Sequence, residues 1–262
     1  MEFIIEDGYN TFYICVLFVA LFHSESMIER CFLIDNNLDN VNYVSNPKQC
    51  LSECDYSMLY FQKIIMYNFV KRLKNSLCIS SRMINEIRLC ALTLGWMSNS
   101  DKKTFNECDP IDFLVFLIKL LNIKVMNIMC PDKNIINDNE LFITTHSIKD
   151  VQTTYNEWEI KNKLINFPIF VIFKIFLNVS PFSINKKIKL FKVGHNYSNV
   201  KWVFHSILYK NNNKYATILY KNDKLFMFSD YNCPCIRIVN ENILHDLKNT
   251  NIYIIYRKEP VI

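Results

Sequence analysis

Glycine is scarce in this chain of 262 residues, which holds only Gly8, Gly95 and Gly194. Loops that cradle phosphate groups need several glycines close together, because the backbone must approach the ligand without side chains in the way. The three glycines are far apart, so the sequence contains neither G-x-G-x-x-G nor a P-loop. Nucleotide-binding enzymes built on those loops are therefore excluded.

A targeting signal and a long hydrophobic run are also lacking. The apolar run 11–22 is too short to cross a bilayer, and acidic residues precede it where a secretory signal would carry basic ones. A second apolar run, 167–179, is similarly short and contains Lys174. The ten cysteines show no regular disulfide framework. We expect a cytoplasmic protein without signal peptide, membrane segment or disulfides.

Composition indicates a folded protein, because half of the residues are hydrophobic and 21% are charged. The net charge of +5 is spread over several short lysine-containing segments, without the interleaved aromatics of a nucleic-acid interface. We therefore expect a solvated surface and no nucleic-acid partner. The richness in Asn, Ile, Lys and Tyr is typical of AT-rich genomes and favours a virus or a reduced parasite as the source.

The first half of the chain reads as helical and the second half as β-rich, which predicts an α+β fold. Helices are expected at 11–22, 57–73, 82–94 with Gly95 ending it, and 110–121 with Asp109 as its cap. Strands of an antiparallel sheet are expected at 125–129, 140–145, 167–176, 189–193, 202–209, 215–220, 225–229 and 252–256, with Asn222 and Asp223 in a turn.

The segment Gly8-Tyr9-Asn10-Thr11-Phe12-Tyr13 opens directly into the first apolar helix. A helix N-terminus lowers the pKa of a thiol and can hold an oxyanion, which makes it a favoured place for a cysteine nucleophile. The segment resembles the cysteine box of ubiquitin-specific peptidases, in which Asn-Thr-Cys-Tyr is expected. Here Phe12 stands where that family has its cysteine.

Later segments are similar to further motifs of the same family, in the family's order. They are 95–114 with Gly-Trp and Asp-x-x-Asp-Phe-Leu, 167–176 with Phe-Pro before an apolar strand, 214–218 and 225–230. The resemblance covers about residues 5 to 236. It implies one ubiquitin-specific-peptidase-like domain, papain-like in fold, with a helical thumb-like lobe at 1–123 and a β-rich palm-like lobe at 124–262, the fingers being reduced.

By this resemblance the catalytic cysteine, histidine and aspartate fall at Phe12, Lys214 and Ser229. Phenylalanine cannot attack a carbonyl, and a lysine with a pKa near 10.4 cannot act as a neutral base. The three positions are expected to face each other across the groove between the lobes, with Phe12 packed in the former cleft and Lys214 at a surface turn. The sequence thus predicts a peptidase framework without its catalytic triad.

Two remnants of the family's site remain. Asn10 resembles the oxyanion-hole asparagine, and an N-cap role would also explain it. Asp230 resembles a second aspartate beside the cleft, and a turn at the end of a strand would also explain it.

A displaced nucleophile is the alternative that keeps activity. Cys15 lies one helical turn after Phe12, and His205, His195 or His23 could serve as its base. A cysteine in an apolar helix is more often part of the core, and His205 reads as a hydrogen-bonded strand histidine. Cys15 with His205 is therefore the second hypothesis.

Zinc is not expected. Family members often hold it with two Cys-x-x-Cys pairs in the fingers, but the stretch 131–166, where fingers would be inserted, contains no cysteine. Cys50 with Cys54 and Cys233 with Cys235 have other spacings. The resemblance thus favours an inactive pseudoenzyme, without cofactor or metal, that binds or scaffolds a protein partner. That partner is either ubiquitin or a ubiquitinated protein, or a protein unrelated to ubiquitin.

Overall fold

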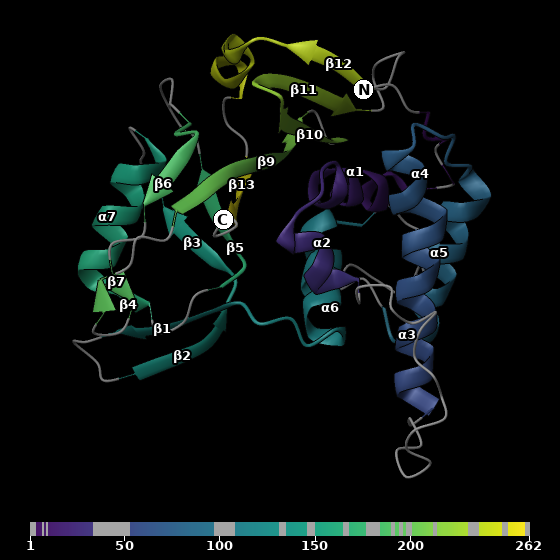
Figure 1. Cartoon of the computed structure of the whole chain (residues 1–262), viewed down its shortest axis with the longest axis horizontal. Coiled ribbons are helices and arrows are strands. Elements are labelled where there is room, and N and C mark those ends of the chain that lie inside the picture. The colour runs from purple at the N-terminus through teal and green to yellow at the C-terminus, as the bar shows by residue number, and fades with distance from the viewer. Residues whose placement is uncertain are drawn as a thin grey trace. The chain divides into compact units, whose positions relative to one another are not determined.

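The structure is a computed structural model, and it describes residues 4–6, 8, 10–33, 53–96, 108–130, 135–145, 150–164, 168–176, 184–189, 192–193, 196–197, 201–211, 214–229, 236–247 and 251–259. Its contacts divide the chain into two compact units (Figure 1). The first unit is Met1–Phe18 with Glu29–Ile123, and the second is Val19–Ile28 with Lys124–Ile262. Each unit is described below by itself.

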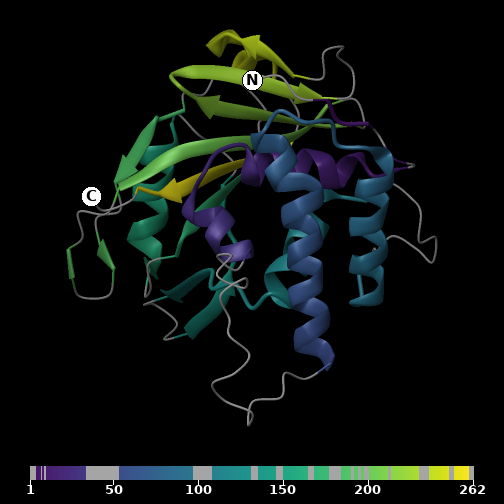
Figure 2. The same cartoon turned by 45° about the vertical axis from the view of Figure 1, so that its right-hand side comes forward.

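Helices build the described part of the first unit. They are α1 Phe12–Phe22, α2 Met27–Phe32, α3 Glu53–Ile65, a π-helix Met66–Val70, α4 Lys71–Lys74, α5 Ser81–Thr93 and α6 Pro110–Leu120. The division between the units falls within α1 and α2, because residues 19–28 belong to the second unit. Figures 1 and 2 both show α3, α4 and α5 next to one another. The helix expected at 57–73 is confirmed as an uninterrupted helical run over 53–74, in which the turn Met66–Val70 is π-helical. Helix α2 is an addition that the sequence did not predict.

Local capping signals set the ends of α5 and α6. The Ser80 side chain accepts a hydrogen bond from the Met83 N–H at the start of α5. Asp109 caps α6 by accepting from the Ile111 N–H at 2.8 Å, and Pro110 occupies its first position, as the sequence predicts.

Gly95 ends α5 in the left-handed conformation, with a φ of 93°. The Trp96 N–H bonds the Ala91 carbonyl at 2.9 Å and the Gly95 N–H bonds the Leu92 carbonyl at 3.1 Å. These two bonds form a Schellman motif, in which glycine avoids the strain that a Cβ would meet at positive φ. The predicted glycine end of this helix is confirmed.

We expect Gly95→Ala to lower the free energy of unfolding by about 1 kcal/mol, because no atom crowds the site and only the backbone conformation opposes the new Cβ. Chemical denaturation measures the loss. Gly95→Asn is the matched control and should lose less, since asparagine tolerates positive φ better than alanine. Equal losses in the two variants would contradict this account.

Two sheets build the described part of the second unit. The larger follows the order β12-β11-β10-β9-β13-β5-β3, with β6 also pairing β9, and the smaller follows β2-β1-β4-β7-β8. The strands are β1 Met126–Cys130, β2 Ile135–Glu140, β3 Phe142–Thr145, β4 Lys163–Leu164, β5 Phe170–Phe176, β6 Lys187–Lys189, β7 Lys192–Val193, β8 Asn196–Tyr197, β9 Lys201–Asn211, β10 Lys214–Lys221, β11 Lys224–Ser229, β12 Ile236–Val239 and β13 Asn251–Lys258.

The larger sheet is mostly antiparallel, as expected, but β3 pairs with β5 in parallel, and in the smaller sheet β4 pairs with β7 in parallel. The second unit also contains helix α7 Val151–Lys161 and a 3-10 helix Glu241–Asp246, neither of which the sequence predicted in the β-rich half. In Figure 1, α7 lies beside β3, β4 and β6. Val151 and Tyr155 of α7 pack in the core with strand residues such as Trp202 and Tyr256.

The hairpin β10–β11 turns at Asn222 and Asp223, which both have positive φ, of 50° and 58°. This is the pattern of a type I′ turn, whose twist matches that of the strands it joins. Lys221 pairs with Lys224 across it, so the predicted turn is confirmed.

Candidate functional site

The approach to α1 is a tight turn in the first unit. A Cβ on Gly8 would lie 2.6 Å from Thr11 Oγ1 and 3.2 Å from the side-chain amide of Asn85 on α5. A glycine is therefore needed here for close packing. The segment resembling a cysteine box is thus held against α5 before the helix begins.

The first turn of α1 corrects one of the two readings of Asn10, the N-cap position. The helix begins at Phe12, and the Thr11 carbonyl accepts the Ile14 N–H at 2.9 Å, so Thr11 holds the N-cap position. Asn10 precedes it in the left-handed conformation, with a φ of 52°. Asparagine is one of the few residues other than glycine that adopt this conformation readily. Asn10 therefore lies in the turn before the N-cap, and its oxyanion-hole role stays a prediction.

Phe12 is the first residue of α1 and is only 6% exposed. Cys15, in the following turn, is fully buried, and no side chain from Tyr13 to Leu21 is more than 1% exposed. A ring, and no thiol, therefore occupies the helix start to which the resemblance assigns the nucleophile.

Three of the segments that resemble family motifs meet inside the first unit. Trp96 Nε1 donates to the Tyr13 hydroxyl at 3.2 Å, and the Phe113 ring meets the Tyr13 ring edge-on at 5.6 Å. Burial raises the pKa of the Tyr13 hydroxyl, and it lowers the pKa of nearby Arg88. These motif residues therefore act as a packed support for the start of α1.

Lys214 and Ser229 lie on neighbouring strands of the second unit. Ala216 pairs directly with Ser229, and Lys214 is two residues before Ala216, so all three project from one face of the sheet. Lys214 is exposed and Ser229 is buried. Lys214 begins β10 and so belongs to a strand instead of the expected turn. Whether Phe12 faces this pair stays a prediction, because Phe12 belongs to the other unit.

Several candidates lie outside the described residues, namely Asp230, His195, Cys50, Cys233 and Cys235. For Cys54 in α3 only the backbone is described. In the parts of the chain that are described, no group of three or more His, Cys, Asp or Glu side chains could hold a metal ion. Within the same ranges no helix is both long and apolar enough to cross a membrane.

His205 sits at an irregularity of strand β9. Against β13, Ile255 pairs with Ser206 and the next residue, Tyr256, pairs with Phe204, so His205 is an extra residue in a β-bulge. The bulge sends His205 and Ser206 to the same face, opposite the face that carries Ser229. His205 Nε2 bonds the Leu21 carbonyl at 3.1 Å, and Ser206 Oγ donates to the Ala20 carbonyl at 2.9 Å.

These contacts complete the C-terminal end of α1 inside the second unit. The last carbonyls of a helix have no partner within the helix, and here side chains supply partners. His23 adds a third contact, since its Nδ1 donates to the Val19 carbonyl at 3.2 Å. Because a carbonyl can only accept, the proton of His205 is on Nε2. The sequence gives one sign of this role, the polar pair His205-Ser206 inside an apolar strand, but no motif points to Ser206.

His23 and His205 form a buried pair with ring centroids 4.3 Å apart. Burial lowers the pKa of His23 to about 4, and it lowers the pKa of His205 well below the ordinary value, with the neighbouring His23 contributing. Lys221 and Arg257 act in the same direction on His23 and His205 respectively. Both imidazoles are therefore neutral near pH 7.

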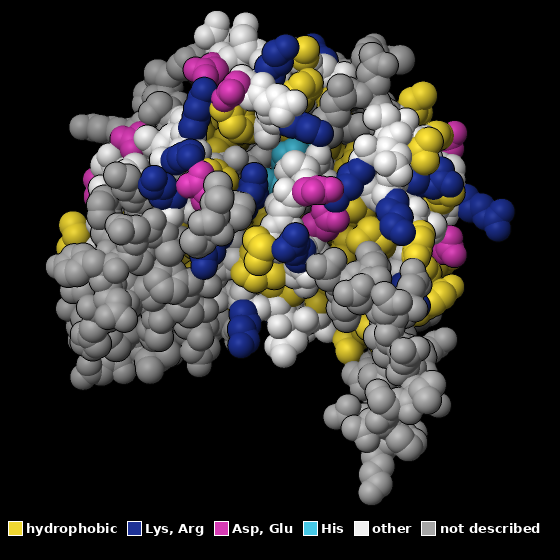
Figure 3. Space-filling view, in the orientation of Figure 1, with side chains coloured by type: hydrophobic (Ala, Val, Ile, Leu, Met, Phe, Trp, Pro, Cys, Tyr) yellow, Lys and Arg dark blue, Asp and Glu magenta, His cyan; other side chains and the backbone are white. Residues whose placement is uncertain are grey.

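The charged surface is mixed. Among the described residues on the face that Figure 3 draws, lysine and arginine side chains are scattered between acidic, apolar and uncharged ones. This distribution is typical of a solvated surface.

Comparison with known proteins supports a fold and nothing finer. No protein-family model and no curated protein matches the chain. Two solved structures are similar over 100% of this chain and 70% of their own chain. One is the SAGA Ubp8/Sgf11/Sus1/Sgf73 DUB module bound to ubiquitin aldehyde, with a TM-score of 0.57 and 11% sequence identity. The other is a Ubp8 variant in the same module bound to monoubiquitin, with a TM-score of 0.59 and 12% sequence identity. The chain therefore has a ubiquitin-specific-peptidase-like α+β fold, as the sequence predicts.

Proposed function

We propose that this chain is a catalytically inactive ubiquitin-specific-peptidase-like protein that acts by binding a protein partner. The observation that carries the proposal is Phe12, a buried ring at the helix N-terminus where the fold's nucleophile is expected. Lys214 and Ser229, on one face of adjacent strands, hold the other two triad positions by resemblance. A phenylalanine, a lysine and a serine cannot perform thiol-protease chemistry together.

The burial of Cys15 argues against the active alternative. A thiol with no exposed surface cannot reach a peptide carbonyl without rearrangement of the helix around it. His205, the base proposed for it, directs its Nε2 proton to the Leu21 carbonyl and is buried. Both residues have a sufficient structural role.

We expect no cleavage of a fluorogenic ubiquitin substrate and no reaction with a covalent ubiquitin probe. The measurement compares the chain with its Cys15→Ala variant and with an active ubiquitin-specific peptidase as a positive control. Turnover that disappears in Cys15→Ala would replace the proposal with the active alternative.

Ubiquitin is the first partner to test, because the two structures compared above hold ubiquitin or ubiquitin aldehyde. A pull-down with monoubiquitin and ubiquitin chains separates a ubiquitin-binding module from a protein that binds another partner. Binding without cleavage would assign the chain the first of these roles. Absence of binding would leave a scaffold whose partner is unrelated to ubiquitin.

A further inference from the structure

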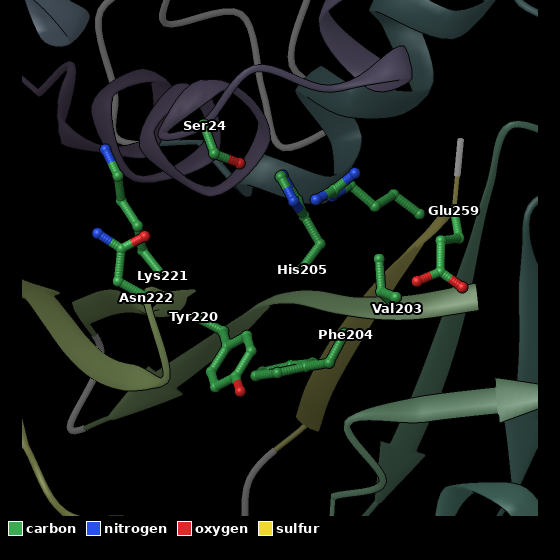
Figure 4. A pocket seen from close by; sticks show the side chains of 9 residues that line it. Ser24, Val203, Phe204, His205, Tyr220, Lys221, Asn222 and Glu259 are labelled. Atoms are coloured by element: carbon green, nitrogen blue, oxygen red, sulfur yellow. The ribbon is translucent and has the colours of Figure 1, made fainter. Parts of the chain in front are cut away.

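The second unit contains a cavity of about 490 Å³ that neither Lys214 nor Ser229 lines. It lies where Ser24 after α1, the bulged part of β9, the β10–β11 turn and the end of β13 come together. Figure 4 shows Lys221 and Asn222 on one side, His205 in the middle and Glu259 on the opposite side, with Ser24 across from the sheet. Its size is in the range of small-molecule sites.

Positive charge is in excess in this cavity. Lys221 and Arg257 are both half-buried and line it. Within the described residues neither forms an ion pair within 4 Å. Glu259, the acidic lining residue, makes its own ion pair with Lys187 at 2.6 Å. Glu259 also acts electrostatically on Arg257, so one carboxylate is shared between Arg257 and Lys187. Two cationic side chains and this one shared carboxylate leave the cavity with net positive charge, which favours an anionic ligand.

The remaining polar groups also suit an oxyanion. Ser24 and the amide of Asn222 can donate hydrogen bonds into the cavity, and arginine presents paired N–H groups to carboxylate or phosphate oxygens. His205 forms the buried side of the cavity, and its Nε2 proton is already donated to the Leu21 carbonyl, so the anion would be held by the other groups.

We propose that this cavity binds the phosphate or carboxylate group of a small molecule, held between Arg257 and Lys221 with Asn222 and Ser24 as further donors. The site is separate from the triad positions, since Lys214 and Ser229 do not line it. The proposal goes beyond the proposed function and does not depend on it, because it needs neither ubiquitin nor inactivity.

The test is a titration of the full chain with inorganic phosphate and, separately, with acetate, at ionic strength held constant with sodium chloride. Calorimetry gives the affinity, and the imidazole NMR signals of His205 report whether the anion enters the cavity. Lys221→Gln and Arg257→Gln are the test variants. Lys224→Gln is the matched control, because it removes the same charge directly across the turn from Lys221 and does not line the cavity.

We expect saturable binding of at least one anion, a shift of the His205 signals, and a loss of about tenfold in affinity in each test variant but not in the control. Phosphate binding alone would assign a phosphate ligand, and acetate binding alone a carboxylate. If Arg257→Gln unfolds, Lys221→Gln decides. The proposal is wrong if neither anion binds up to about 50 mM, if the His205 signals do not move, or if Lys224→Gln weakens binding equally.

Discussion

We expect the folded chain to lose about 3 kcal/mol of stability from His23 alone when the pH falls from about 6.5 to about 4. In the unfolded chain His23 takes up its proton near pH 6.5, whereas burial in the folded state delays this to about pH 4. Between these values the unfolded state binds more protons, so acidification favours unfolding. The stabilising contribution is fully present above about pH 6.5, and His205 adds to the loss in the same direction.

Chemical denaturation at a series of pH values between 4 and 8 measures this effect. His23→Gln should be less stable than the parent chain at pH 7.5 but should show a flatter pH dependence. His245→Gln is the control, since it removes a histidine from elsewhere in the chain. A parent chain whose stability does not change between pH 7 and pH 5, or a His23→Gln variant that keeps the full slope, would contradict the buried neutral pair.

Restoring the thiol alone should not restore catalysis. Phe12→Cys places sulfur at a helix N-terminus that lowers the thiol pKa, yet Lys214 cannot accept its proton as a neutral base would. The change should also cost up to about 3 kcal/mol of stability, because a buried ring is removed. A covalent ubiquitin probe and a denaturation curve measure the two effects.

The triple variant Phe12→Cys, Lys214→His, Ser229→Asp supplies all three chemical groups. If the resemblance assigns the three positions correctly, it should react with the probe while the single variant does not. The matched control keeps the histidine and aspartate but leaves Phe12 in place, and it should be inert. Turnover by Phe12→Cys alone would mean that another residue already acts as base. An inert triple variant that still binds ubiquitin would contradict the assignment of the positions.

Local signals account for the parts of the fold that could be predicted. Gly95, Asp109 with Pro110, and Asn222 with Asp223 each act through the backbone geometry of their own few residues, so the sequence alone was sufficient to place them. The apolar content of 11–22 likewise predicted α1 to within one residue.

Features that depend on distant segments were missed. The parallel pairing of β3 with β5 joins strands separated by α7, and nothing near Phe142 encodes that choice. α7 itself is a weakly patterned helix that becomes stable by packing Val151 and Tyr155 into the core. The candidate site shows the same difference between local and distant signals. A local motif was sufficient to identify Phe12, whereas the role of Ser206 depends on the register between β9 and β13.

The extra residue in β9 also changes which positions of that strand are interior. Before His205 the even-numbered Trp202 and Phe204 belong to the core, and after it the odd-numbered Ile207 and Tyr209 do. A shift of alternation inside one strand hides its amphipathic pattern from any scan with a fixed period of two. Deleting His205 would restore regular alternation and leave Trp202, Phe204, Ile207 and Tyr209 on the core face, but it would remove the contact with the Leu21 carbonyl. The extra residue in β9 therefore serves the end of α1 and not the packing of the sheet.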